Sequence, residues 1–219
     1  MKRTLLALLA IVLTNAAFSQ ENEHKTAAEN YQISTDMLFG HKDFVGEFFF
    51  LKPIDDKGRW LAVSRSELHL PNYRSDEQEF VNFNTFSYNF KNGLGIGAGS
   101  YASTHYRFSA RIGLQYFKEK ENYMVYSFLS TSVLNHADAQ LLLIGSYTPA
   151  IATHWRFFSR AEWRSALEYG EGHTFSNQLV RLGVQYKKLA FGAGTELEET
   201  GKDFEEFHCN IGPFFRYLF

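Results

Sequence analysis

Hydrophobic and polar residues alternate along most of the chain with the period of two that is typical of β-strands. In residues 106–116 the even positions are mainly apolar or aromatic, and the odd positions are polar residues or glycine. Residues 155–168 show the same alternation, with Trp155 and Trp163 on the apolar face, and residues 207–219 repeat it. The pattern therefore predicts a chain built almost entirely from strands with one apolar and one polar face.

Turn signals divide the chain into twelve expected strands. Asn92-Gly93 is a strong hairpin dipeptide, and Lys187-Lys188 marks another very short connection. Longer polar connections lie at residues 71–78, 169–173 and 198–203. The expected strands lie near residues 31–39, 44–52, 59–69, 79–90, 93–101, 105–117, 123–134, 140–148, 154–168, 174–186, 189–197 and 205–219.

Aromatic residues near the strand ends favour a membrane barrel over a soluble sandwich. A strand tilted by about 40° rises about 2.5 Å per residue along the membrane normal, which separates Tyr106 from Tyr116 by about 25 Å. By the same geometry Trp155 and Trp163 are about 20 Å apart. These distances match a lipid-facing band of about 25 Å between two aromatic girdles. Aromatic residues make up 17% of the chain, and so much apolar surface excludes a disordered protein.

The predicted fold is all-β, an antiparallel transmembrane up-and-down β-barrel of twelve strands that occupies residues 31–219. In the alternative, residues 20–58 form a periplasmic extension or plug and ten strands remain. Both chain ends are expected on the periplasmic side, which requires an even number of strands. No later window holds 18 uninterrupted apolar residues, so no transmembrane helix is expected.

Residues 1–19 have the three parts of a secretory signal peptide. Lys2 and Arg3 give a positive start, residues 5–13 form a short apolar core, and Ala17-Phe18-Ser19 offers small residues before the cleavage site. The core is too short to remain as a transmembrane helix, which needs about 20 apolar residues. After cleavage, residues 20–30 are expected to form a short periplasmic segment. An uncleaved amphipathic N-terminus is the alternative.

Composition and motifs exclude several other classes of protein. The net charge is −2, from 22 basic and 24 acidic residues, so a nucleic-acid partner is not expected. Cys209 is the single cysteine and cannot form an internal disulfide. The sequence has no P-loop, dinucleotide fingerprint or zinc CxxC pair, and we expect neither a cofactor nor a metal. Five histidines are interpreted as solvated residues of loops or strand tips: His41, His69, His105, His136 and His173.

The C-terminus resembles the assembly signature of Gram-negative outer-membrane β-barrels. The chain ends in FFRYLF, with Phe215, Tyr217 and Phe219 on one face of the last expected strand. With the signal peptide and the alternation, this ending is similar to that of a small barrel of no recognised subfamily. The resemblance implies an outer-membrane location, contact with outer-membrane lipid, and recognition of the last strand by the barrel assembly machinery. Pro213 departs from the pattern, because it removes a backbone donor from that strand.

Charged residues occupy the strand faces opposite the aromatic ones and would line the lumen of the predicted barrel. In one interpretation, arginine and glutamate pair across a narrow, filled interior and hold the barrel closed. In the other, an excess of arginine lines a narrow aqueous pore that favours anions. A twelve-stranded wall is only modestly wider than an eight-stranded one, whose interior is filled by side chains. The predicted lumen-lining residues are Glu47, Arg59, Arg65, Glu67, Arg107, Arg111, Arg156, Arg160, Glu162, Arg164, Glu168, Arg181 and Arg216.

Three functions are compatible with such a barrel. The first is a narrow channel or passive transporter for small polar or anionic solutes. The second is a closed structural or surface-binding barrel that contacts a ligand through its outer loops. The third is an outer-membrane enzyme that hydrolyses lipid or peptide, although no catalytic motif surrounds the residues available, and we expect no enzymatic activity. The residues nominated for the third are His69 with Ser66 and Glu67, and His173 with Ser176 and Glu171.

Overall fold

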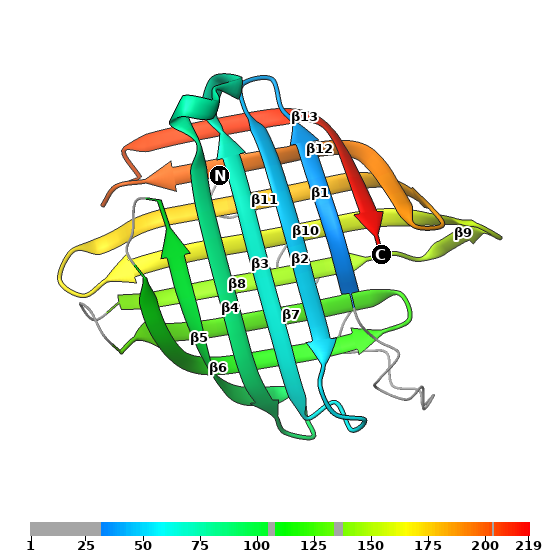
Figure 1. Cartoon of the computed structure of the whole chain (residues 1–219), viewed down its shortest axis with the longest axis horizontal. Helices are drawn as coiled ribbons and strands as arrows, with labels where there is room; N and C mark the ends of the chain where they lie inside the picture. Colours follow the sequence, from blue (N-terminus) through cyan, green and yellow to red (C-terminus); the bar gives the residue numbers. More distant parts are fainter. Residues whose placement is uncertain (1–31, 105–107, 134–137, 203) are drawn as a thin grey trace.

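A closed antiparallel β-barrel forms most of the described structure. Across residues 32–104, 108–133, 138–202 and 204–219, which the computed structural model describes, twelve strands pair in sequence order. Closure occurs where β1 (Gln32–Phe39) pairs with β13 (Glu206–Leu218) (Figure 1). A further short strand, β9 (Ala150–Ala152), lies outside the wall and pairs with β10. The twelve-strand prediction is confirmed, and the ten-strand alternative is wrong, because β1 and β2 belong to the wall.

Each remaining wall strand pairs with the strands before and after it in the wall, so the barrel is an up-and-down meander. Among the described residues, no helix is long and apolar enough to cross a membrane. Two single-turn 3₁₀ helices, η2 (Pro71–Tyr73) and η3 (Ser75–Glu77), lie between β3 and β4. The remaining strands are β2 (Phe44–Pro53), β3 (Trp60–Leu70), β4 (Glu79–Asn89), β5 (Leu94–Ser103), β6 (Ser109–Lys120), β7 (Tyr123–Ser132), β8 (Asp138–Tyr147), β10 (Trp155–Glu168), β11 (Gly172–Tyr186) and β12 (Leu189–Thr200).

The barrel has two rims with different connections. The turn rim carries the connections after β2, β4, β6, β8 and β11, together with the start of β1 and the end of β13. The loop rim carries the connections after β1, β3, β5, β7, β10 and β12. The predicted signal peptide, residues 1–19, and the segment 20–30 lie outside the described residues.

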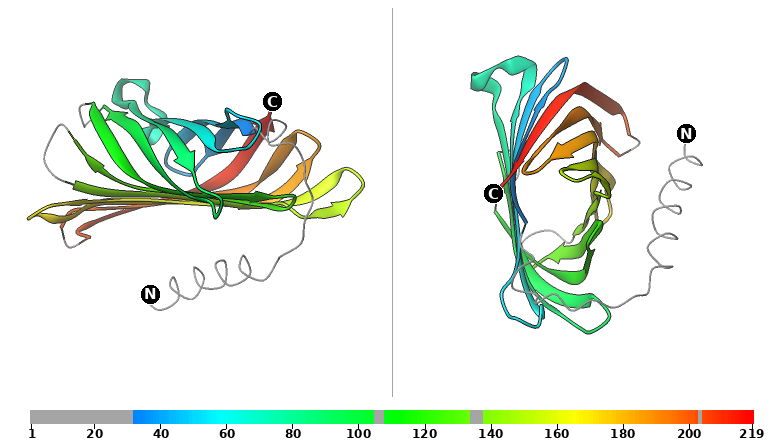
Figure 2. Two further views of the ribbon diagram at one scale, coloured as in Figure 1. Left: turned by 90° about the horizontal axis from the view of Figure 1, so that it is seen from below. Right: turned by 90° about the vertical axis from the view of Figure 1, so that its right-hand side faces the viewer.

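The barrel is flattened into two layers (Figure 2). Strands β1 to β4 form one layer, and β7, β8, β10 and β11 form the other, with the two sets crossing at a large angle (Figure 1). Between these layers, Gly97 of β5 lies opposite Gly113 of β6, and Gly194 of β12 lies opposite Gly212 of β13. A Cβ atom on Gly212 would overlap the carbonyl oxygen of Phe39. Glycine is therefore required at position 212, where β13 passes close to the end of β1.

Large apolar side chains cover the outside of the wall. Leu114 on β6 is 62% exposed, and every wall strand presents at least one such side chain. A contiguous apolar exterior of this extent is unusual for a protein surrounded by water. One exposed example from each wall strand, in chain order, is Met37, Phe48, Trp60, Phe86, Ile96, Leu114, Leu129, Tyr147, Phe157, Leu182, Leu189 and Ile211.

Pro213 does not prevent closure of the barrel. It lies opposite Ala193 in the ladder between β12 and β13. The ladder between β13 and β1 ends with the pair Phe214 and Leu38, one residue short of the proline. The missing backbone donor therefore falls at the end of the closing ladder, where a proline disturbs pairing least.

Candidate functional site in the barrel interior and at the loop rim

Arg65 of β3 is the centre of an ion-paired network that crosses the barrel. Its Nη2 lies 2.9 Å from Glu47 Oε2 and 2.6 Å from Glu67 Oε2, and its Nε donates to Glu162 Oε2 at 2.8 Å. Arg160 completes the network, with Nη2 3.0 Å from Glu47 Oε1 and Nε 2.6 Å from Glu162 Oε1. Glu162 and Arg160 lie on β10, which is not a neighbour of β2 or β3 in the wall. The network therefore joins the two layers through the interior.

A second group of charges surrounds Asp36 of β1, a residue that the sequence analysis did not nominate. Arg216 Nη1 lies 3.1 Å from Asp36 Oδ2, and Arg181 Nε lies 3.9 Å from Asp36 Oδ1. The Arg216 guanidinium also lies 5.5 Å from the centre of the Phe158 ring. Asp36 alternates with the outward-facing Met37, so the period of two in β1 was the signal that could have placed it inside.

Apolar side chains fill the interior between this network and the turn rim. They come from β2, β3 and β4 in one layer and from β7 and β8 in the other. The rings of Phe83 and Phe128 are 5.8 Å apart across the interior, and the Tyr126 hydroxyl lies 2.8 Å from Thr85 Oγ1. Phe49, Tyr126 and Phe128 are each 0% exposed. The interior has a packed core at this level.

The charges buried in the described residues are balanced. They comprise six arginines and six carboxylates, in contrast to the nine arginines and four glutamates expected to line the lumen. The difference arises because Arg59 and Arg156 are not buried and Arg107 is outside the described residues, whereas acidic residues such as Asp36 and Glu196 are buried. The two sets are Arg65, Arg111, Arg160, Arg164, Arg181 and Arg216, and Asp36, Asp43, Glu47, Glu67, Glu162 and Glu196.

Two further arginines from the predicted set are buried, Arg111 apart from the central network and Arg164 at its edge. Arg111 of β6 forms two hydrogen bonds with Asp138, at 2.8 and 2.9 Å, and donates to Ser130 Oγ at 2.9 Å. Arg164 lies 3.7 Å from Glu67 and covers the ring of Phe175 at 4.8 Å. Each buried guanidinium therefore has an acidic or aromatic partner, as burial of arginine requires.

The remaining predicted lumen residues lie elsewhere. Arg59 is not in the interior, because β3 begins only at Trp60 and leaves Arg59 exposed in the preceding turn, where it pairs with Asp55 at 3.1 Å. Arg156 is half-buried at the turn rim, where its Nε donates to the Thr148 carbonyl. Glu168 is half-buried at the end of β10 on the loop rim. Arg107 lies outside the described residues.

Asp43 lies in the connection between β1 and β2, and several side chains of the loop rim contact it. Its Oδ2 lies 2.5 Å from His208 Nε2 and 3.3 Å from His69 Nε2, and its Oδ1 accepts the Asn72 N–H at 2.9 Å. Burial raises the pKa of the Asp43 carboxyl, but the Asn72 hydrogen bond and the two histidines outweigh burial and leave the pKa below its ordinary value. His69 is thus a half-buried partner of a carboxylate, and not the fully solvated residue that the sequence predicted.

Asn210 and Tyr73 extend the contacts around Asp43. The Asn210 amide oxygen accepts the backbone N–H groups of Lys42 and Asp43, each at 3.2 Å, and its Nδ2 donates to the Asp43 carbonyl at 3.1 Å. The Tyr73 hydroxyl donates to the Gly40 carbonyl. We call Asp43, His69, Tyr73, His208 and Asn210 the rim latch, because together they join the connection between β1 and β2 to β3, to β13 and to the loop after β3.

The nominated hydrolase residues do not form a complete catalytic arrangement. His69 binds Asp43, whereas Ser66 Oγ accepts the Asn82 amide at 2.8 Å. His173 Nε2 does lie 2.8 Å from Ser176 Oγ, but its Nδ1 lies 2.9 Å from the Gly201 carbonyl and not beside a carboxylate. Ser176 is 4% exposed, so its hydroxyl is covered. A nucleophile must be able to reach its substrate as well as its base.

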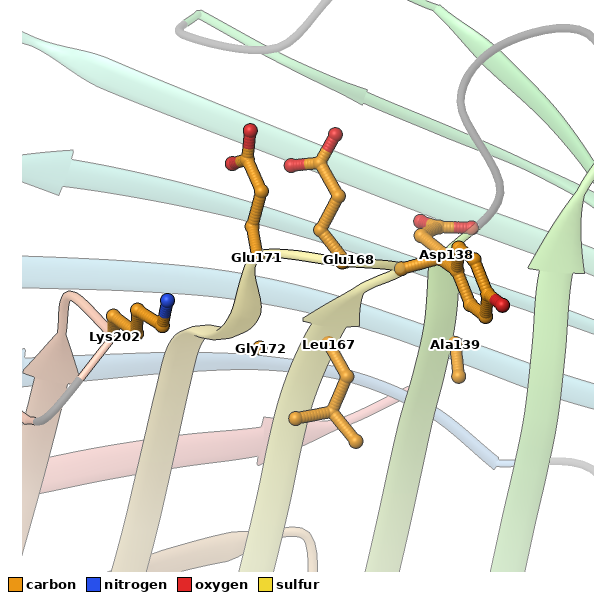
Figure 3. A pocket seen from close by; sticks show the side chains of 9 residues that line it. Asp138, Ala139, Leu167, Glu168, Glu171, Gly172 and Lys202 are labelled. Carbon is orange, nitrogen blue, oxygen red and sulfur yellow. The ribbon is translucent and has the colours of Figure 1, made fainter.

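A shallow hollow of about 570 Å³ lies at the loop rim, beside the turn between β10 and β11. Glu168 and Glu171 project to the same side of this turn, whereas Leu167 and Ala139 point to the other (Figure 3). Lys202 approaches from the loop after β12 (Figure 3). Among the described residues, no group of three or more histidine, cysteine or acidic side chains could hold a metal ion.

Comparison with known proteins does not assign the chain to a family. No protein-family model matches it, and neither does any curated protein. Among solved structures, the porin NanC has 7% sequence identity and a TM-score of 0.48 over 87% of this chain and 100% of its own. The β-domain of the Bordetella autotransporter BrkA has 13% identity and a TM-score of 0.38, over 88% and 100%. The outer-membrane protein OmpT of Vibrio cholerae has 11% identity and a TM-score of 0.35, over 87% and 97%.

Proposed function

We propose that this chain is an outer-membrane β-barrel with a closed interior, which serves as a structural or surface-binding protein through its loop rim. The observation that carries this proposal is the filling of the interior by cross-barrel contacts. Arg65 and Glu162 join the layers, and Phe49 and Phe128 pack beneath them with no exposed surface. Groups packed in this way occupy the space that a continuous path for water would need.

The apolar exterior supports placement in a membrane. Every wall strand presents large apolar side chains outward, while charges are buried inside, which is the reverse of the arrangement of a protein in water. The resemblance of the FFRYLF ending and of the N-terminal signal to those of Gram-negative barrels favours the outer membrane. Placement of both chain ends in the periplasm then turns the loop rim toward the cell exterior.

The balance of buried charge favours a closed barrel over an anion channel. An anion-selective lining requires positive groups that remain free to meet the solute. Here the buried arginines face as many carboxylates, and the central ones are paired at 2.6–3.0 Å. The proposed role of the arginines is therefore to hold the two layers together.

The loop rim supports a surface-binding role. The rim latch fixes the first two outer connections against β13, so these loops offer an ordered surface. Aromatic side chains project from the same rim, with Tyr169 89% exposed and Tyr73 51% exposed. Exposed tyrosines on ordered loops are frequent contact residues in protein recognition. The ligand would be a surface molecule outside the cell or a small solute.

Planar-bilayer recording of the refolded mature protein tests the closed interior. We expect no steady conductance step in wild type, with insertion verified by the change in gel mobility between unheated and heated samples. A reproducible open step with anion preference would support the channel interpretation and overturn this proposal. A barrel that does not insert at all would overturn the placement in a membrane.

The last strand provides a separate test of the proposed assembly signal. Phe215, Tyr217 and Phe219 are 47%, 43% and 56% exposed on the outside of the barrel. If they are recognised by the assembly machinery, Phe219→Ala lowers the amount of folded barrel in cells without changing its folding in detergent. Equal loss in both settings would show that the residue acts on stability alone.

A further inference from the structure

A compact group of aromatic and basic residues lies at the turn rim, where β11 turns into β12. Trp155 pairs with Tyr186 across neighbouring strands, and their rings are 4.9 Å apart. The Trp155 ring is also 6.4 Å from that of Phe191 on β12. Lys187 and Lys188 form the two-residue turn directly beside these rings. We call these five residues the basic-aromatic patch.

The two lysines of the patch are exposed, and their ammonium groups form no ion pair within the described part of the chain. Among the described residues, neither has a carboxylate within 4.0 Å, although ion pairs are formed by several other side chains. Lys187 Nζ lies 5.4 Å from the centre of the Tyr186 ring, so the ammonium group is kept beside the aromatic surface. Two adjacent positive charges at the edge of an apolar wall are therefore available to a negatively charged partner.

The backbone of the Lys187-Lys188 turn gives independent support for a role of the positive charge. Lys187 has a φ of 53°, in the left-handed region where glycine, asparagine and aspartate are favoured in two-residue hairpins. A lysine at this position adds backbone strain that asparagine or glycine would largely relieve. Lys187 thus places a positive charge at this turn against the local backbone preference.

We propose that the basic-aromatic patch binds the phosphodiester headgroup of an anionic phospholipid in the leaflet at the turn rim. Lysine binds phosphate as a compact charge, and tryptophan and tyrosine are favoured at the level of lipid headgroups. The proposal rests on the membrane placement given above, which puts this rim in the periplasmic leaflet. Basic side chains near an anionic lipid surface strengthen binding about fivefold each.

Apolar side chains next to the patch favour a lipid over a protein or a free phosphate ion. Leu189 lies opposite both Tyr186 and Tyr217 in the adjacent ladders, and it is 42% exposed on the outside of the wall. Tyr217 is 43% exposed, and Phe157 on β10 is 37% exposed. These side chains continue from the lysines along the outer wall, where acyl chains attached to a bound headgroup would lie.

Quenching of Trp155 fluorescence by brominated lipids tests the proposal. Trp60→Phe and Trp163→Phe leave Trp155 as the single tryptophan, and the protein is refolded in phosphatidylcholine vesicles at low salt. Equal mole fractions of brominated phosphatidylglycerol or brominated phosphatidylcholine are then added in separate arms. We expect at least a fivefold higher relative affinity for phosphatidylglycerol, and a loss of this preference in high salt.

Lysine variants distinguish a specific lipid site from general electrostatic attraction to anionic lipid. Lys187→Asn together with Lys188→Gln is expected to abolish the preference, and asparagine tolerates the positive φ. Lys91→Gln, at the turn between β4 and β5 on the same rim, is the matched control and is expected to leave the preference unchanged. An equal loss in Lys91→Gln would overturn the site in favour of diffuse attraction.

Two further results would also overturn the site. One is the absence of a preference in wild type, and the other is displacement of brominated phosphatidylglycerol by an equal concentration of inorganic phosphate. Gel mobility and bilayer recording in phosphatidylcholine alone report on the closed barrel itself. Failure of the lipid site with normal insertion therefore differs from failure of the proposed function.

Discussion

Arg65 on β3 and Glu162 on β10 are hydrogen-bonded at 2.8 Å although their strands lie in opposite layers of the barrel. Both side chains are buried, and Glu162 also accepts from Arg160 at 2.6 Å. The two walls are therefore held together by charge as well as by apolar packing. This arrangement makes the interior sensitive to the loss of one partner.

Replacement of Glu162 by glutamine is expected to lower the free energy of unfolding by about 3–5 kcal/mol, because it leaves Arg65 and Arg160 buried beside a neutral group. Urea titration of the refolded barrel in vesicles, followed by tryptophan fluorescence, measures this loss. Glu171→Gln, at the turn between β10 and β11, is the control and is expected to change stability by no more than about 0.5 kcal/mol. Equal stabilities of the two variants would show that the network contributes nothing.

The rim latch predicts a dependence of stability on acidic pH. The pKa of the Asp43 carboxyl in the folded protein lies below its ordinary value of 3.8. Its ionised form therefore stabilises the folded state above about pH 3.8, and that contribution is lost as the pH falls through the lower, folded value. Asp43→Asn is expected to cost about 1–2 kcal/mol at neutral pH, with a difference that shrinks below pH 4. A difference that stays constant from pH 7 to pH 3 would contradict the assignment.

Gly212 is expected to be intolerant of even one added methyl group. Its substitution by alanine would drive Cβ into the Phe39 carbonyl at the seam between β13 and β1, at a cost of about 3 kcal/mol. Gly145→Ala is the matched control, since a Cβ there meets no atom within 4 Å. The folded fraction after refolding, read from gel mobility, distinguishes the two. Similar yields would mean that the close approach at the seam is not required.

If the outer surface of the wall faces lipid, an added charge should change stability differently at two equally exposed positions, one on the wall and one outside it. Leu114 on β6 is 62% exposed and Ile151 on β9 is 63% exposed, but only Leu114 belongs to the barrel wall. In vesicles, Leu114→Arg is expected to lower stability by about 2–4 kcal/mol, whereas Ile151→Arg costs about 0–1 kcal/mol. Urea titration of both variants measures the difference. Equal effects would argue against a hydrocarbon environment around the wall.

The alternation of side chains, together with the turn signals, predicted the twelve wall strands but not the short strand β9. It works here because each wall strand separates two environments, so Arg65 and Leu61 point inward while Trp60 points outward. The flattening could not be predicted in this way. Gly97 and Gly113 meet across the ladder between β5 and β6, and a single-strand pattern does not show which glycines will be opposite each other.

The site was harder to predict than the wall, because pairing across the interior depends on distances between strands far apart in the sequence. Arg65 and Glu162 were expected inside, but nothing in the sequence indicated that they would meet. Asp43 was missed because it follows a strand end, where alternation stops. Arg59 was misplaced for the same reason, since it precedes the first residue of β3.

The flattened cross-section has a geometric consequence. A closed wall of fixed perimeter encloses the greatest area when it is circular, and this one is far from circular (Figure 2). Gly194 and Gly212 face each other in the ladder between β12 and β13, on one side of the wall between the two layers. A rounder wall with the same strand pairings would enclose a larger area, so the flattening, and not the number of strands, keeps this interior narrow.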